Sequence, residues 1–165
     1  MATVVAVLAG TLMTVPPAQA APLYYQIKNG EHGLCLDGNT GNGNPVYVWD
    51  CVGARNQRWT FEFVGNEGYA RIRNAKTNLC LRVQGGVHYD APLINGPCGD
   101  TWDAWWKGID MIDAGTYDYY HLTPYYLRGV YCINAPNGVN GTAVGIERCF
   151  FPPRPTNYWT WMRTA

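Results

Sequence analysis

Four side chains that could hold a hydroxylated ligand lie close together in the first third of the sequence. Asp37 offers a carboxylate that accepts hydrogen bonds, while Asn56 and Gln57 offer amides that both donate and accept. Hydrogen bonds to a charged group are roughly twice as strong as neutral ones. Trp49 offers an aromatic plane that can cover the weakly polar C–H face of a ring. Together these groups suit a ring with neighbouring hydroxyls.

The sequence offers little for catalysis. It contains no serine, which excludes serine-based triads. The three histidines stand far apart without ligand-like spacing, and we expect each at the surface or at a strand edge: His32, His88 and His121. The densest acidic group reads as solvated loop residues rather than a pair of catalytic carboxylates: Asp103, Asp110, Asp113 and Asp118. These observations predict a binding protein that is not an enzyme and needs no cofactor.

The six cysteines fall into three pairs of nearly equal spacing: Cys35 and Cys51, Cys80 and Cys98, Cys132 and Cys149. Six cysteines allow fifteen connectivities, and the even spacing favours one bridge within each pair. Tight Cys or His pairs of the kind that bind zinc are missing, so we expect no metal. Bridged cysteines also leave no thiolate for catalysis.

An internal repeat surrounds these cysteines. "YYQIKNGEHGLCL" (24–36) aligns without gaps to "YARIRNAKTNLCL" (69–81), and "YYHLTPYYLRGVYCI" (119–133) matches with two inserted residues. Apolar and polar residues alternate in these stretches, as in strands with one buried face. Each unit closes on a tryptophan that we expect in the core: Trp59, Trp105 and Trp159. The sequence predicts three all-β units around a shared axis, at about residues 23–65, 66–115 and 116–165.

The first twenty residues are unlike the rest. Residues 2–13 are apolar but too short to span a bilayer, and Pro16, Pro17 and a small-x-small motif at 18–20 follow. We interpret residues 1–20 as a secretory signal peptide and 21–165 as one secreted domain.

The chain has 12 basic and 12 acidic side chains, so it lacks the basic surface of a nucleic-acid binder, and we expect no membrane span.

The motifs Cys-Leu-Asp (35–37), Trp-x-Cys (49–51) and Asn-Gln-x-Trp (56–59) resemble those of ricin B-chain-type β-trefoil lectins and carbohydrate-binding modules. The resemblance implies a β-trefoil with a disulfide in each repeat and up to three shallow sugar sites. It implies that Asp37 binds sugar hydroxyls, Trp49 stacks on the sugar, Asn56 bonds a hydroxyl and Gln57 orients Asp37. Tyr47 departs from the family, which often has Gln there. The expected partner is a carbohydrate, either a galactose-like sugar or a polysaccharide.

The second unit has lost these residues. Arg82 stands at the position of Asp37 and Gly96 at that of Trp49, and we align Trp102 and Asp103 with Asn56 and Gln57. We expect no sugar site in this unit.

The third unit is intermediate. Asn134 replaces the aspartate, Glu147 takes the stacking position, and Thr156 and Asn157 align with the amide pair. Asn134 and Asn157 therefore form a possible weak site.

An alternative function is that of a trefoil protein-binding inhibitor, for example of a protease, presenting Arg154 between the prolines of "FFPPRP" (150–155).

Overall fold

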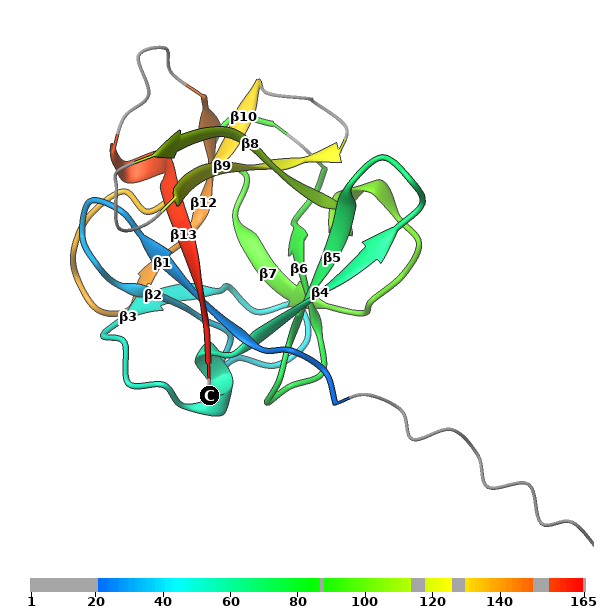
Figure 1. The fold of residues 1–165 in the computed structure, drawn as a ribbon, viewed down its shortest axis with the longest axis horizontal. Coiled ribbons are helices and arrows are strands. Elements are labelled where there is room, and N and C mark those ends of the chain that lie inside the picture. The colour runs from blue at the N-terminus through cyan, green and yellow to red at the C-terminus, as the bar shows by residue number, and fades with distance from the viewer. Residues whose placement is uncertain (1–20, 87, 114–117, 126–129, 150–154, 165) are drawn as a thin grey trace, which may run out of the picture.

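The computed structural model describes residues 21–86, 88–113, 118–125, 130–149 and 155–164. The interpretation of residues 1–20 as a signal peptide lies outside this part of the chain. The described residues form an all-β fold with three short 3-10 turns (Figure 1). The elements of the first unit are β1 (Tyr25–Asn29), β2 (Cys35–Asp37), β3 (Tyr47–Trp49), η1 (Arg55–Gln57) and β4 (Trp59–Val64). The second unit contains β5 (Tyr69–Asn74), β6 (Cys80–Val83), β7 (Leu93–Gly96), η2 (Trp102–Ala104) and β8 (Trp106–Asp113). The third contains β9 (Asp118–Pro124), β10 (Tyr131–Asn134), β11 (Thr142–Ala143), β12 (Gly145–Arg148), η4 (Pro155–Asn157) and β13 (Tyr158–Arg163).

Six of the strands close into a barrel. β1 pairs with β4, β4 with β5, β5 with β8, β8 with β9, β9 with β13, and β13 again with β1, all antiparallel. A closed ring satisfies the backbone hydrogen-bonding groups that an open sheet would leave at its edges. The barrel is therefore built from two hairpins, β4–β5 and β8–β9, and from the antiparallel pair of β1 and β13, which brings the two ends of the chain together.

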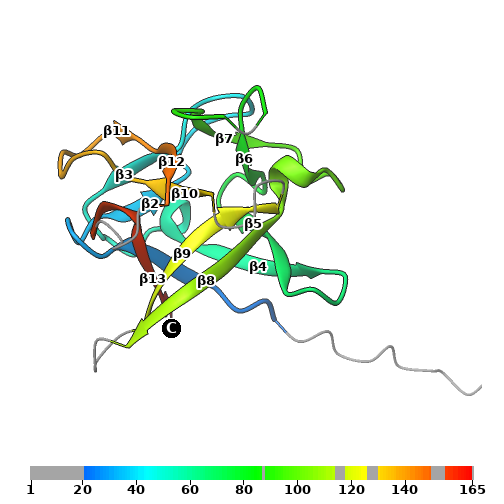
Figure 2. The ribbon, with the colours of Figure 1, turned by 90° about the horizontal axis from the view of Figure 1, so that it is seen from above.

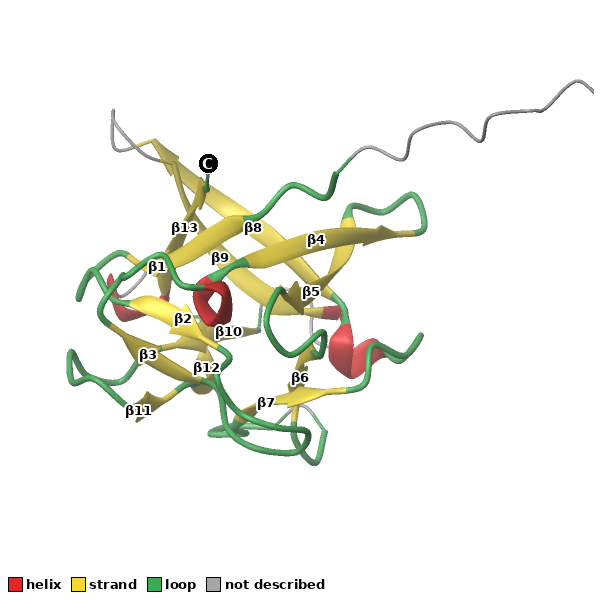
Figure 3. Cartoon of the chain, turned by 90° about the horizontal axis from the view of Figure 1, so that it is seen from below, coloured by secondary structure: helices red, strands yellow, loops and turns green. Residues whose placement is uncertain are grey.

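Three further hairpins cap one end of the barrel. They are β2 with β3, β6 with β7, and β10 with β12. Figures 2 and 3 show these hairpins on one side of the molecule and the barrel strands on the other. The arrangement is the predicted β-trefoil, in which each repeat supplies two barrel strands and one capping hairpin.

The core lies inside the barrel and under the caps, and one tryptophan of each repeat reaches its centre. Trp59, Trp106 and Trp159 are buried. Their indole N–H groups donate to the carbonyl oxygen of the residue after the first cysteine of each repeat: Leu36 at 3.0 Å, Leu81 at 2.9 Å and Ile133 at 3.0 Å. These three bonds tie the barrel to its capping hairpins in the same way three times.

The prediction of Trp105 as the closing tryptophan of the second repeat is wrong. Trp106 takes that role, and Trp105 is only half-buried. Side chains alternate between the two faces of a strand, so only one residue of a Trp-Trp pair can point inward. Strand β8 begins at Trp106, directly opposite Ala70 of β5, and this register selects the second tryptophan of the pair.

The three predicted disulfides are confirmed. Bridges join Cys35 to Cys51, Cys80 to Cys98 and Cys132 to Cys149, one in each repeat. In each repeat the first cysteine is fully buried, on the first strand of the capping hairpin. Each bridge therefore fastens the segment that follows the hairpin back onto the hairpin itself.

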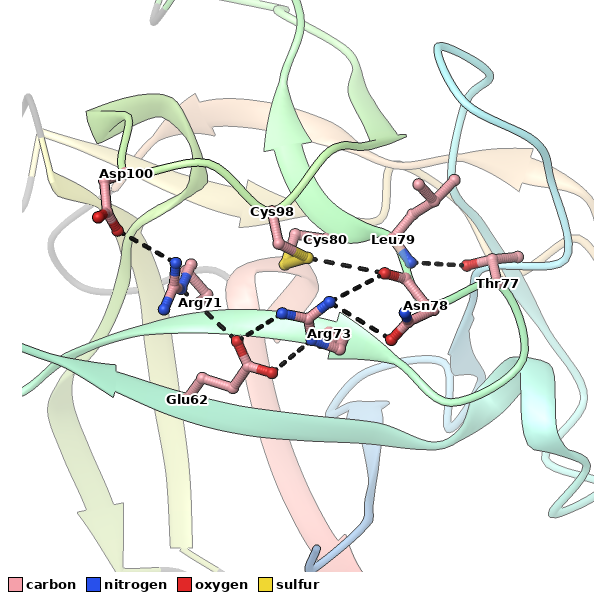
Figure 4. Close-up of polar contacts among 9 residues, drawn as sticks. All are labelled: Glu62, Arg71, Arg73, Thr77, Asn78, Leu79, Cys80, Cys98 and Asp100. Atoms are coloured by element: carbon pink, nitrogen blue, oxygen red, sulfur yellow. Dashed lines mark hydrogen bonds and ion pairs between the residues drawn. A yellow bond between two sulfur atoms is a disulfide. The ribbon is translucent and has the colours of Figure 1, made fainter.

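A charged cluster stabilises the outer face of the hairpin β4–β5 (Figure 4). The carboxylate of Glu62 accepts a hydrogen bond of 2.9 Å from Nη2 of Arg73, a second one from Nε of the same side chain, and lies 3.6 Å from Nε of Arg71. Arg71 also donates to Asp100 at 3.1 Å. The hydrogen bond from Arg73 is the main cause that lowers the pKa of Glu62; partial burial opposes it, and the charges of Arg73 and Arg71 add to it.

Within the described residues, none of the helical segments has the length and apolar character that crossing a membrane would require.

Candidate functional site

A pocket of about 360 Å³ opens on the capping hairpin of the first repeat. Four of the five predicted sugar-site residues line it: Asp37, Tyr47, Trp49 and Asn56. The structure also places four residues there that the sequence analysis did not single out: Asn39, Thr40, Val52 and Ala54. Asn39 and Thr40 belong to a Gly- and Asn-rich loop, which gives no sign in sequence that it turns back onto the pocket.

Asp37 is held in place by three hydrogen bonds. Its Oδ2 accepts from Nδ2 of Asn56 at 2.7 Å and from Nε2 of Gln57 at 3.2 Å. Its Oδ1 accepts from the backbone N–H of Asn39 at 2.9 Å. Asp37 is 8% exposed, yet it still lines the pocket. A carboxylate has about four acceptor positions, so capacity remains for a ligand hydroxyl.

Gln57 lies behind the pocket instead of lining it. Its side chain is fully buried, and Nε2 donates to the carbonyl oxygen of Asp50 at 2.8 Å as well as to Asp37. Its Oε1 accepts from the backbone N–H of Val52 at 2.9 Å. Gln57 thus connects the carboxylate to the chain on either side of Cys51, a geometry that suits the orienting role implied by the resemblance.

The second repeat helps to hold Asn56. Asn74, fully buried at the end of β5, donates from Nδ2 to the carbonyl oxygen of Asn56 at 2.7 Å. The backbone N–H of Gly38 donates to the same oxygen at 2.9 Å. A Cβ at position 38 would lie 2.7 Å from Nδ2 of Asn74, so glycine allows the loop to pass this close.

Trp49 is 46% exposed and stands at the rim of the pocket. Its ring rests against the third repeat: a Cβ at Gly141 would lie 3.3 Å from Cζ3 of Trp49. Next to it, Nδ2 of Asn140 donates to Oδ2 of Asp50 at 2.6 Å, and the backbone N–H of Asp50 donates to Oδ1 of Asn140 at 2.9 Å. The turn around Asn140 therefore buttresses the strand that carries Trp49.

In the second repeat, an ion pair occupies the place that the pocket has in the first repeat. Nε and Nη2 of Arg82 donate to Oδ2 of Asp103 at 2.8 Å and 2.6 Å. A Cβ on Gly96 would lie 2.6 Å from Cδ of Arg82, so the arginine stem covers the place that Trp49 holds in the first repeat. Charged donors and acceptors that satisfy each other in this way leave little for a ligand.

The sequence alignment of this repeat needs a correction. When the 3-10 turns η1 and η2 are aligned residue by residue, Asp103 corresponds to Asn56 and Ala104 to Gln57. This is one residue away from the predicted Trp102 and Asp103, because Trp106 and not Trp105 closes the repeat.

The expectation that the acidic group lies in loops is also wrong, although Asp118 is exposed as expected. The side chain of Asp103 is 15% exposed and paired with Arg82. Asp110 and Asp113 belong to strand β8, and Asp118 begins strand β9.

The third repeat has a smaller hollow of about 200 Å³. Asn134 lines it, together with Asp90 of the second repeat, which the sequence analysis missed. Asn157 is fully buried at the position of Gln57 and does not line the hollow. Glu147 pairs with Cys132 as Trp49 does with Cys35. Arg154, the centre of the inhibitor hypothesis, lies outside the described residues.

The prediction that all three histidines lie at the surface or a strand edge is wrong for His121. It is 1% exposed, and its ring stacks on Tyr158 with centroids 5.0 Å apart. Strand β9 runs between β8 and β13, and His121 pairs with a residue of each, so it does not lie at a sheet edge. Within the part of the chain that the structure describes, His, Cys, Asp and Glu side chains form no group of three that could hold a metal ion.

Comparison with protein families matches residues 11–95 and 55–147 to the family described as "Ricin-type beta-trefoil lectin domain-like". No curated protein sequence matches the chain. Among solved structures, the ricin B-like lectin of Macrolepiota procera in complex with lactose is 17% identical, with a TM-score of 0.72 over 88% of this chain and 99% of that one. The Rhizoctonia solani agglutinin is 16% identical, with a TM-score of 0.71 over 90% and 99% of the two chains.

A third similar structure is a larger enzyme. The exo-β-1,3-galactanase 1,3Gal43A of Clostridium thermocellum is 21% identical, with a TM-score of 0.76 over 92% of this chain but only 31% of the enzyme. At these identities the structures show a shared fold. The family match covers most of the chain, from the predicted leader into the third repeat, and so the chain belongs to the ricin-type β-trefoil lectin-domain-like family.

Proposed function

We propose that the chain is a lectin that binds an exposed sugar of a glycan or polysaccharide mainly through the pocket of its first repeat. The observation that carries this proposal is the buried carboxylate of Asp37, held by Asn56, Gln57 and the backbone of Asn39 in a pocket with an exposed tryptophan at its rim. A sugar ring would lie with its C–H face on Trp49 and direct hydroxyls to Asp37 and Asn56.

A galactose-like sugar is the first candidate. Among the similar structures, one is a lectin in complex with lactose and another an exo-β-1,3-galactanase, and both names point to galactose-containing ligands. Tyr47 pairs with Asp37 across the hairpin and lines the same pocket. Its phenol replaces an amide that is frequent in the family, so we propose that Tyr47 shapes the hydroxyl preference of this chain.

The chain would act outside the cell and without catalysis. The family, the fold and three disulfides fit a secreted binding protein, since disulfides persist in oxidising compartments. We propose that residues 1–20 are removed on export. N-terminal sequencing of the exported protein should start near Ala21, and a start at residue 1 would contradict this part of the proposal.

Sugar binding can be tested by calorimetric titration with lactose and by a glycan array. Asp37→Ala removes an acceptor of charge-assisted hydrogen bonds, each of which contributes about 1.5–3 kcal/mol, and should lower the affinity about tenfold or more. Asn134→Ala, at the equivalent position of the third repeat, is the matched control and should change the affinity little. An array without any bound saccharide would refute the proposal, and equal effects of the two variants would place the main site elsewhere.

A further inference from the structure

The open end of the barrel, opposite the capping hairpins, contains a second and larger pocket. Its volume is about 520 Å³, against about 360 Å³ for the pocket of the first repeat. Its lining comes from the barrel strands, from Gly68 in the turn between β4 and β5, and from Pro22 and Leu23, which precede β1. In Figure 3 the described chain enters the barrel on this side, away from the caps. The proposed sugar site uses none of these residues.

Threefold equivalence explains why this pocket exists. Tyr25, Ala70 and Tyr120 are equivalent, because each pairs directly with the buried tryptophan of a neighbouring strand. Phe61, Gly108 and Trp161 are also equivalent, because each pairs with a buried aliphatic residue of its partner strand: Ile72, Leu122 and Ile27. In both of these sets of equivalent positions the first and third repeats supply aromatic rings, while the second supplies only alanine and glycine. The missing volume of the second repeat opens the end of the barrel.

The four aromatic rings form a continuous wall. Tyr25 meets Phe61 with ring centroids 5.5 Å apart, Phe61 meets Trp161 at 5.5 Å, and Tyr120 stacks on Trp161 at 4.1 Å. A Cβ on Gly108 would lie 2.9 Å from Cη2 of Trp161, so the indole has already taken the space at Gly108. The remaining space is therefore bordered by rings that support one another and by the small side chain of Ala70.

The lining indicates which ligand would fit. None of the described residues that line the pocket is charged. Their side-chain polar groups are hydroxyls and the indole N–H of Trp161, because the indole N–H of Trp106 already donates to Leu81. Sugars and ions need charged or amide partners, as in the first repeat, whereas an apolar ring or chain gains from leaving water. Its volume of about 520 Å³ lies within the roughly 300–1,000 Å³ of clefts that hold drug-sized ligands. Phe63, 76% exposed, extends the apolar surface at the rim.

We propose that the open end of the barrel is a binding site for a neutral, largely apolar small molecule of two or three rings or an equivalent aliphatic chain. The site is independent of the sugar pocket, which lies on the capping hairpins. A ligand could therefore occupy it while a sugar is bound.

The test uses N-phenyl-1-naphthylamine, a neutral three-ring probe whose fluorescence rises in apolar surroundings. Titration of the full chain should show saturable binding of one probe per chain, unchanged by lactose and by Asp37→Ala. Ala70→Tyr restores the ring that the other two repeats carry at this register, and should fill the pocket and weaken probe binding at least tenfold. Retained lactose binding shows that this variant is folded.

A milder pair of variants keeps the test decisive if Ala70→Tyr does not fold. Phe63→Ser removes an exposed ring at the rim and should weaken probe binding several-fold. Tyr89→Ser removes a comparably exposed ring, 53% exposed, that does not line the pocket, and should have no effect. Absence of saturable binding, or equal losses in Phe63→Ser and Tyr89→Ser, would overturn the proposal.

Discussion

The side chains at positions 37 and 82 show how one register can carry two opposite chemistries. Asp37 receives hydrogen bonds from neutral amides and keeps acceptor capacity toward the pocket. Arg82, at the same place in the second repeat, is neutralised by Asp103, the counterpart of Asn56. The loss of the aspartate is thus accompanied by a change at its partner position, and by a glycine under the arginine stem. These three changes together turn a pocket into a closed ion pair.

Glu62 gives a pH-dependent prediction. Its pKa lies below 4.5 in the folded protein because Arg73 donates to its carboxylate. A lowered pKa contributes stability above the unfolded-state value, and this contribution is lost as the pH falls through the folded-state value. The carboxylate is 30% exposed, so solvent screens the pair. Glu62→Gln should lower the free energy of unfolding by about 0.5–1 kcal/mol at pH 7.

Urea denaturation at several pH values would measure this difference. The gap between the native protein and Glu62→Gln should narrow below pH 4.5, as the native carboxylate becomes protonated. Asp100→Asn is the matched control, since Asp100 is 78% exposed and pairs with Arg71 only at the rim of the cluster. A gap that stays constant down to strongly acid pH would show that shape, and not charge, gives Glu62 its effect.

At the scale of elements, the short strand β11 joins the third repeat to the proposed sugar pocket of the first. Thr142 and Ala143 pair with Val48 and Tyr47 of β3, which places the preceding turn beside Trp49. Trp49 and Asp50 consequently depend on Gly141 and Asn140, about ninety residues further along the chain. The pocket is supported by all three repeats, although the residues that line it all come from the first.

Asn140→Asp should therefore weaken sugar binding without touching the ligand. The change is isosteric, but it replaces the amide that donates to Asp50 with a carboxylate that repels it. The lost hydrogen bond contributes about 1 kcal/mol. Because it holds the strand that carries Trp49, its loss should lower the affinity roughly three- to tenfold. Titration with lactose would measure it.

The double variant Asp50→Asn with Asn140→Asp is the control for this pair. It restores a donor and an acceptor in the reverse direction, and the new carboxylate at position 140 can still accept from the backbone N–H at position 50. The affinity should therefore recover. Failure of the double variant to recover would mean that Asn140 acts through something other than Asp50.

At the scale of the whole molecule, the threefold architecture is predictable because it repeats. The cysteine pairs and the aligned stretches at 24–36 and 69–81 place the strands, and the structure confirms one bridge in each repeat. The error at Trp105 arose where two tryptophans adjoin, since spacing alone cannot tell which one faces inward. The positions of Asn140, Asp90 and His121 depend on pairing between distant strands, and no local pattern reports it.

The disulfides allow a test of whether repeats that are equivalent in the fold also contribute equally to ligand binding. Removing the bridge Cys35–Cys51 or the bridge Cys80–Cys98, with alanine at both positions, opens a loop of 16 or 18 residues. Each change should lower the free energy of unfolding by about 3 kcal/mol. Only the first should weaken lactose binding, because Cys51 lies between Asp50 and Val52, both of which hydrogen-bond to the Gln57 side chain that positions Asp37.

Chemical denaturation and lactose titration, both at a temperature where each variant is folded, would separate the two effects. Equal losses of stability with unequal losses of affinity would support a fold carried by all three repeats and a function carried by one. Equal losses of affinity would instead mean that the pocket depends as much on the second repeat, which contacts it through Asn74 at Asn56 and through Asn95 at Thr40.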